Sequence, residues 1–208
     1  MLIDGPIGRL EARLDAPTGA VRAAVVLASP NPQLGGTMLS RVVHEAARGL
    51  TRIGCATLRF NFRGAGLSEG SHDGGAGERR DFAAALDFLA ARYPATPLWA
   101  AGYSFGAWVA LVEGATDPRV DLLIGIAPPV ESYDFSPVLE ASKPVFLVQG
   151  DRDELCSLGA TRRFYAQLDE PKEIAIVDGA DHLFDSLTAE VGDALVDLLG
   201  DYESGGTS

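Results

Sequence analysis

The pentapeptide Gly-Tyr-Ser-Phe-Gly at 102–106 has the residue types and spacing that most clearly suggest chemistry in this chain. Its serine, Ser104, follows an apolar run at 97–101 that predicts a buried strand, and it precedes 107–113, which predicts a helix. A serine in this position, with a glycine two residues to either side, has the form of a nucleophile elbow. The glycines permit the tight turn, because larger side chains would clash where the backbone reverses. The pattern arises by chance in about one in six chains of this glycine and serine content, so the other elements must decide its meaning.

A serine hydroxyl becomes an effective nucleophile only when a positioned base takes its proton. The chain has three histidines. His182 follows the last predicted strand, whereas His44 lies inside a predicted helix and His72 lies in a glycine-rich loop at 64–77. Reactive groups of doubly wound sheets gather at the carboxyl ends of strands. His182 is therefore the expected base, although the loop could also carry His72 toward the serine.

The acid that orients such a base is expected after another strand. The apolar run at 145–148 is followed closely by Asp151 and Asp153, so both carboxylates are candidates. Taken singly, Asp153 is equally consistent with a loop carboxylate that caps the next helix. Ser104, an aspartate and His182 each follow a predicted strand, however, and these three independent placements predict a catalytic triad.

Apolar runs bounded by glycine and proline alternate with amphipathic segments along the chain. Strands are expected at 8–15, 23–28, 55–62, 97–101, 122–127, 145–148 and 174–177. Helices are expected at 38–50, 78–93, 107–113, 161–168 and 188–199. The last three strands are almost continuously apolar, which is typical of a parallel sheet covered by helices on both faces. We therefore expect one α/β domain over residues 1–202 and a disordered polar tail at 203–208.

Composition excludes several classes of function. The net charge of −12 at pH 7 repels nucleic acid and anionic membranes. No run approaches the roughly 18 apolar residues of a membrane span, and the start at Met1 lacks the features of a signal peptide. Cys55 and Cys156 have no metal-type neighbour in the sequence, which indicates small buried thiols in a reducing compartment. With no phosphate or dinucleotide motif, we expect a cytoplasmic protein with a small-molecule partner and neither metal nor cofactor.

Nearly the whole chain resembles the α/β-hydrolase superfamily, most closely the small, lid-poor bacterial serine hydrolases described as dienelactone-hydrolase-like. The motifs that carry the likeness lie at 29–38, 58–70, 102–106, 150–153 and 179–182. The resemblance implies an α/β-hydrolase fold with a mostly parallel central sheet, the chain order serine, aspartate, histidine, and Asp153 rather than Asp151 as the acid. Many relatives have histidine at the positions of Ser29 and Asn31, which shapes a loop and leaves the triad intact. Dienelactone hydrolases themselves use cysteine, so Ser104 argues against that substrate.

The oxyanion of an acyl-transfer reaction needs two backbone N–H groups. One is expected from Phe105, directly after the nucleophile at the start of a helix. The other is expected from Asn31, because its neighbours Pro30 and Pro32 have no N–H to donate. Side chains that either line an acyl pocket or simply pack near it are Leu34, Tyr103, Tyr133, Phe135 and Phe184.

The connection at 128–143 is too short for a large lid domain, which predicts an open site that favours short acyl chains. Arg63 is expected to hold its loop through an ion pair, or else to face a substrate carboxylate. The expected function is cleavage of a small ester through an acyl-enzyme on Ser104. A thioesterase, a small-peptide hydrolase and an acyltransferase would share the same residues, and a non-catalytic binding protein is the alternative from another class. The sequence leaves both a monomer and a homodimer open.

Overall fold

The computed structural model describes residues 1–202, and the predicted tail at 203–208 lies outside the described residues. The strands are β1 (Leu2–Gly5), β2 (Gly8–Asp15), β3 (Ala23–Ala28), β4 (Cys55–Phe60), β5 (Leu98–Tyr103), β6 (Val120–Ile126), β7 (Val145–Gly150) and β8 (Lys172–Val177). The helices are α1 (Arg41–Arg52), α2 (Ala76–Arg92), α3 (Phe105–Thr116), α4 (Ser136–Glu140), α5 (Leu158–Tyr165) and α6 (Thr188–Leu199), with a short 3₁₀ helix, η1 (Pro32–Leu34).

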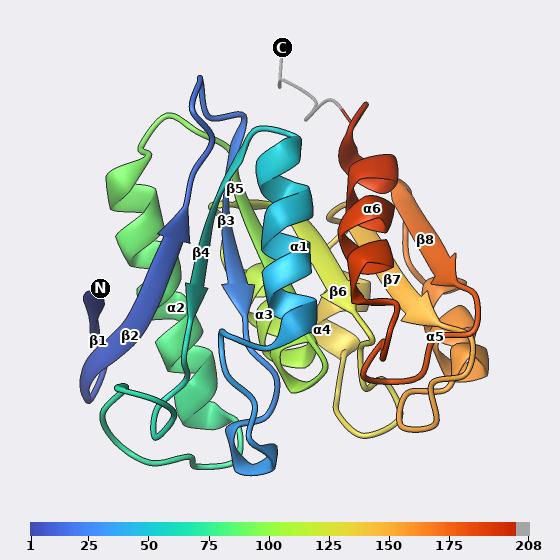
Figure 1. Cartoon of the computed structure of the whole chain (residues 1–208), viewed down its shortest axis with the longest axis horizontal. Helices are drawn as coiled ribbons and strands as arrows, with labels where there is room; N and C mark the ends of the chain where they lie inside the picture. The colour runs from blue at the N-terminus through green and yellow to red at the C-terminus, as the bar shows by residue number, and fades with distance from the viewer. Residues whose placement is uncertain (203–208) are drawn as a thin grey trace.

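Within residues 1–202 the strands form one eight-stranded sheet in the order β1-β2-β4-β3-β5-β6-β7-β8. β1 and β2 run antiparallel to their neighbours, and all pairs from β4 to β8 are parallel. The carboxyl ends of the parallel strands therefore lie along the lower edge of the molecule in Figure 1. The loops that follow those strands converge at this edge, which is where an α/β sheet places its site.

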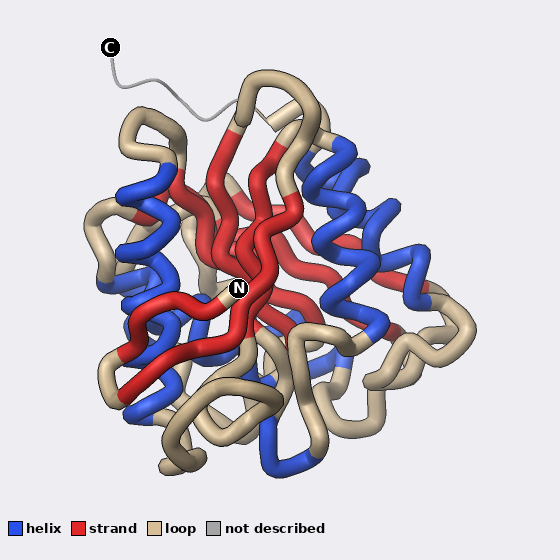
Figure 2. Tube along the Cα trace, turned by 60° about the vertical axis from the view of Figure 1, so that its left-hand side comes forward, coloured by secondary structure: helices blue, strands red, loops and turns tan. Residues whose placement is uncertain are grey.

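Helices cover both faces of the sheet. Figure 2 shows the strands between two groups of helices. Val25 and Leu27 of β3 pack in the same cluster as residues of α1 and α6, which lie in front of the sheet in Figure 1. Ala24 and Val26 point to the other face and pack in the cluster that contains residues of α2 and α3. Every residue of β3 is buried, as expected for a parallel strand with helices on both sides. No helix within residues 1–202 combines the length and apolar character needed to cross a bilayer.

Four elements differ from the sequence prediction: β8, β1, α4 and the three-residue η1, which lies in a segment expected to be a loop. The run at 174–177 was expected to be covered on both faces, but β8 is an edge strand and Ile176 is 37% exposed. That expectation is wrong because an apolar run does not reveal how much of an edge strand the flanking helices cover. The sequence analysis also missed β1 and α4, which are each five residues or shorter. Segments of this length offer too few residues for a periodic pattern to be recognised.

Candidate active site

Ser104 lies in the turn between the end of β5 and the start of α3. Its backbone has φ 56° and ψ −124°, a strained conformation for a residue with a side chain, of the kind that persists where a site needs it. The turn closes tightly enough to exclude side chains at both glycines of the pentapeptide. A Cβ on Gly102 would lie 2.0 Å from the carbonyl oxygen of Gly106, and a Cβ on Gly106 would lie 2.4 Å from that of Ser29. The glycines are thus required by space, as the elbow prediction assumed.

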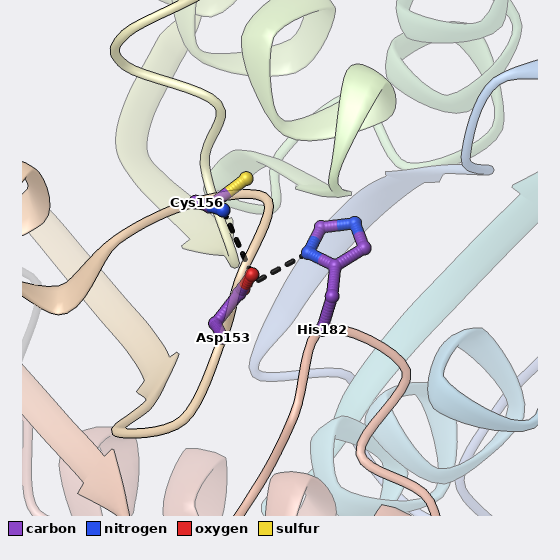
Figure 3. Close-up of side chains that lie close together, drawn as sticks. All are labelled: Asp153, Cys156 and His182. Atoms are coloured by element: carbon purple, nitrogen blue, oxygen red, sulfur yellow. Dashed lines mark hydrogen bonds and ion pairs between the residues drawn. The ribbon is translucent and has the colours of Figure 1, made fainter.

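Three side chains from three strand ends form a continuous hydrogen-bonded line. Ser104 Oγ lies 2.9 Å from His182 Nε2, and His182 Nδ1 lies 2.9 Å from Asp153 Oδ2. Figure 3 shows the imidazole of His182 facing the carboxylate of Asp153. His182 and Asp153 are buried, at 5% and 6% exposure. The residues chosen from the sequence as nucleophile, base and acid are therefore brought together.

The carboxylate of Asp153 is held by four donors. Its Oδ1 accepts the backbone N–H groups of Leu155 (2.9 Å) and Cys156 (2.8 Å), and its Oδ2 accepts from His182 and from Gln149 Nε2 (3.0 Å). Burial, the largest influence, acts to raise the pKa of Asp153. The hydrogen bonds from His182 and the two backbone N–H groups outweigh it, so the pKa is lowered from its ordinary value. Ionised Asp153 can only accept, which places a proton on His182 Nδ1 and leaves Nε2 free to accept from Ser104.

The alternative residues lie elsewhere. His44 is exposed on α1. His72 has Nδ1 3.0 Å from Glu78 Oε1 and no hydrogen bond to Ser104. Asp151 is exposed and accepts the backbone N–H of Gly179 at 2.7 Å, so it does not orient His182. The geometry thus favours His182 over the other histidines and Asp153 over Asp151.

Two free N–H groups line the pocket beside Ser104. The N–H groups of Phe105, at the start of α3, and of Asn31 donate to no other residue within 1–202. Asn31 is the N-cap of η1, and its side-chain oxygen accepts from the backbone N–H of Gln33. That bond holds the loop without using the N–H of Asn31. Both groups predicted for an oxyanion hole are therefore available at the pocket wall.

Comparisons with known proteins agree with this geometry. The family model described as serine aminopeptidase, S33, matches residues 19–142, more than half of the chain. An α/β serine hydrolase homologue from Coxiella burnetii is similar in structure, with a TM-score of 0.90, 36% identity and 96% of each chain covered. The chain belongs to the α/β-hydrolase superfamily.

Two further relatives are similar to this α/β-hydrolase over nearly its whole length. The structure of XC6422 from Xanthomonas campestris, an α/β serine hydrolase without a lid, has a TM-score of 0.88 and 34% identity, and the match covers 95% of this chain and 91% of that one. An uncharacterized protein of Rickettsia prowazekii is 35% identical over 205 residues, which is 94% of this chain and 86% of the relative. The matches extend over almost the full length of each protein, so this chain is similar along its length to a serine hydrolase without a lid.

The pocket of the α/β-hydrolase opens above Ser104 and has a volume of about 730 Å³. Leu34, Tyr103 and Tyr133, for which the sequence left pocket lining and packing both open, line it. Tyr103 also donates its hydroxyl to the carbonyl oxygen of His182 at 2.7 Å, and the two rings stack with centroids 5.7 Å apart. The sequence analysis missed Leu155 and Leu183, which line the same pocket and are 62% and 65% exposed. Each lies within two residues of a predicted triad residue, which is the signal that could have identified it.

For Phe135 and Phe184 the sequence left open whether they line the pocket or pack in the core, and the structure places both in the core. Neither side chain lines the pocket above Ser104. Phe184 is fully buried and packs edge-on against Tyr103, with ring centroids 6.4 Å apart. Phe135 is 5% exposed and packs against Phe164 of α5, with centroids 5.3 Å apart. Both rings belong to the hydrophobic core because the loops that carry them fold back onto the sheet.

Arg63 forms the ion pair that the sequence analysis favoured over contact with a substrate. Its Nη2 and Nε lie 2.7 and 3.0 Å from the two oxygens of Asp81, and its backbone N–H also donates to Asp81. Both residues are buried, and the hydrogen bond from Arg63 to Asp81 raises the pKa of the guanidinium. Arg63 Nη1 also lies 3.4 Å from Asp73, so the pair fastens the glycine-rich loop at 64–77 to α2.

Figure 3 shows a trio formed by Asp153, Cys156 and His182. Their ligand-type atoms lie within 4.8 Å of one another. Such residue types bind zinc in other proteins. Each oxygen of Asp153 already accepts two hydrogen bonds, however. Burial, with a smaller effect of the charges of Asp153 and Glu131, raises the pKa of the Cys156 thiol to about 12. A metal would have to displace a hydrogen bond from Asp153 and the tightly held proton of the Cys156 thiol. We therefore interpret these residues as part of the hydrogen-bonded triad and not as a metal site.

Proposed function

We propose that this protein is a serine esterase that cleaves a small ester through an acyl-enzyme on Ser104. The observation that carries the proposal is the line from Ser104 through His182 to Asp153, with 2.9 Å at each of its two steps. A serine at a pocket that is hydrogen-bonded to a buried histidine and carboxylate is the arrangement that activates a hydroxyl for attack on an acyl carbon.

In this proposal His182 Nε2 accepts the proton of Ser104 as Oγ attacks the ester carbonyl. Asp153 keeps His182 in the required tautomer and stabilises the imidazolium that forms. The negative oxygen of the tetrahedral intermediate accepts the N–H groups of Phe105 and Asn31. His182 then donates its proton to the departing alcohol, and a water that it deprotonates releases the acid from Ser104.

The pocket supports a small substrate with an apolar part. Leu34 and Tyr133 present apolar surface beside Ser104. The connection between β6 and β7 contains the five-residue α4 and has no room for a lid domain. Without a lid, a long lipid chain would extend into water, so burial of its apolar surface would add little to binding.

A short peptide is the second candidate, and a specific feature favours it. Asp181 and Asp185 line the same pocket, and a carboxylate there is the group that would pair with the free amine of a peptide. The matched family model, described as serine aminopeptidase, S33, points the same way.

A substrate panel separates these candidates. We expect p-nitrophenyl acetate and butyrate to be cleaved with a higher kcat/KM than p-nitrophenyl palmitate, an acyl thioester or an aminoacyl p-nitroanilide. Faster turnover of the anilide would replace the esterase proposal with a peptidase, and faster turnover of the thioester would replace it with a thioesterase. If no member of the panel is cleaved in a Ser104-dependent manner, the esterase proposal fails.

The predicted role of the Asn31 N–H can be isolated by two substitutions at one position. Asn31 has φ −56°, which proline adopts without strain, so Asn31→Pro removes the N–H at little cost to the backbone. Asn31→Ala removes the same side-chain cap of η1 but keeps the N–H. We expect Asn31→Pro to lower kcat about 10²–10³-fold and Asn31→Ala to remain within about threefold of the wild type, as measured by steady-state ester hydrolysis. Equal losses in both variants would exclude this N–H as an oxyanion donor.

A further inference from the structure

Gln149 is an unusual residue for its position in the sheet. It is the one polar side chain of β7, whose other members are apolar or glycine, and it is fully buried. A buried amide costs free energy unless its donors and acceptor all find partners. β7 leads directly to Asp153, so this amide lies beside the carboxylate of the line described above.

Every polar group of the Gln149 amide has a partner. Nε2 donates to Asp153 Oδ2 at 3.0 Å and to the carbonyl oxygen of Cys156 at 2.9 Å. Oε1 accepts the hydroxyl of Thr161, which is also fully buried, at 3.0 Å. The opposite orientation of the amide would turn its oxygen toward three acceptors, including the carbonyl oxygen of Gly150, so the network allows one orientation only.

We propose that Gln149 is a positioning residue for the triad, which fixes the Asp153 oxygen that faces His182, and that Thr161 holds the Gln149 amide in place. The inference rests on the proposed function, because it assigns Gln149 a role in activating Ser104. Gln149 and His182 share one acceptor, Oδ2, whereas the backbone N–H groups of Leu155 and Cys156 share the other. Among residues 1–202, the amide is therefore the one side chain besides His182 that holds Oδ2 directly.

Loss of the amide has two expected effects on the serine. Asp153 becomes free to rotate about its remaining contacts, so His182 spends less time aligned with Ser104. Oδ2 also loses a neutral donor, so it accepts more strongly from His182 Nδ1 and favours the imidazolium. The acidic midpoint of the reaction at Ser104 is therefore expected to move to higher pH.

Two other ionisable groups near Asp153 and His182, a thiol and a phenol, stay neutral at acidic pH. The thiol of Cys156 and the phenol of Tyr103 both have pKa values raised by burial, so they remain neutral. Asp181 and Glu131 are the nearby carboxylates. Neither contacts Gln149, and replacement of Gln149 leaves both in place.

The test measures how fast a fluorophosphonate probe labels Ser104 as a function of pH, which requires no knowledge of the substrate. We expect Gln149→Leu to slow labelling about tenfold and to move its acidic midpoint upward by about half a pH unit or more. Thr161→Val removes only the hydroxyl that holds the amide and should change both quantities in the same direction by less. Thr57→Val is the matched control, because Thr57 is equally buried and its hydroxyl has no partner within residues 1–202.

The outcomes separate this inference from the proposed function. Wild-type protein that is folded but unlabelled at Ser104 overturns both. Wild-type labelling together with an unchanged rate and midpoint in Gln149→Leu overturns the positioning role alone, even if the variant unfolds at a lower temperature. If Gln149→Leu does not fold, the labelling of Thr161→Val tests the positioning role instead. A shift of its midpoint supports the inference, and behaviour equal to Thr57→Val overturns it.

Discussion

Ser104→Ala is expected to lower kcat for ester hydrolysis by about 10⁶-fold, close to the loss seen when a triad acts without its nucleophile. The substitution removes the oxygen that forms the acyl-enzyme and leaves the pocket and both N–H donors in place. The measurement is steady-state hydrolysis of p-nitrophenyl butyrate, with fluorophosphonate labelling as a second readout. Both signals should disappear together.

The loss should not reflect unfolding. Alanine keeps the Cβ of Ser104, so the strained backbone at φ 56° is unchanged. The hydroxyl contributes the hydrogen bond to His182, and a single such bond contributes about 1 kcal/mol to stability. We expect the thermal midpoint to change by a few degrees at most. Ser136→Ala, on the exposed start of α4, is the control and should keep full activity. Activity of Ser104→Ala within tenfold of the wild type would contradict an acyl-enzyme on this residue.

The triad of Ser104, His182 and Asp153 could be predicted from the sequence. Local patterns identify each residue, and one rule of sheet topology brings the three together. The strand, the turn glycines and the following helix identify Ser104 within about fifteen residues of sequence. The run of buried strands predicts a parallel sheet, and a parallel sheet brings its carboxyl ends to one edge. Residues that follow different strands are thereby brought close without any knowledge of their contacts.

The pocket wall could be predicted only in part, because it depends on which way each loop folds. Leu34 and Phe184 are both large apolar residues in loops near the site, yet Leu34 is 83% exposed and Phe184 is fully buried. Phe184 is buried because Tyr103 offers it a ring to pack against. Such a pairing joins residues 81 positions apart in the chain, and no local pattern records it.

Gln149 illustrates the opposite case. The sequence indicates that its amide is hydrogen-bonded, but it does not identify the partners. A single polar residue in an otherwise apolar strand indicates a buried hydrogen bond, since an unpartnered amide would destabilise the core. The partners are Asp153 and Thr161, which lie in the following loop and in α5. Their contact depends on the angle at which that loop leaves β7, so only the structure identifies them.

Asp153→Asn is expected to lower kcat for ester hydrolysis by about 10⁴-fold. The amide oxygen would take the two backbone N–H donors of Leu155 and Cys156, which leaves the amide NH₂ to face His182 Nδ1. His182 would then carry its proton on Nε2 and could no longer accept from Ser104. The NH₂ would also face the donor Nε2 of Gln149, so we expect a lower thermal midpoint as well.

Asp151→Asn provides the matched control, since it makes the same chemical change two residues away. Asp151 is exposed, and its oxygen accepts the backbone N–H of Gly179, a bond that an asparagine oxygen can also accept. Its kcat should therefore stay within a few-fold of the wild type. Because Asp153 could fail by destabilisation alone, each variant is assayed well below its thermal midpoint. If Asp151→Asn loses more activity than Asp153→Asn under those conditions, then Asp151 orients His182 in solution. Asp153 would then not be the acid of the triad.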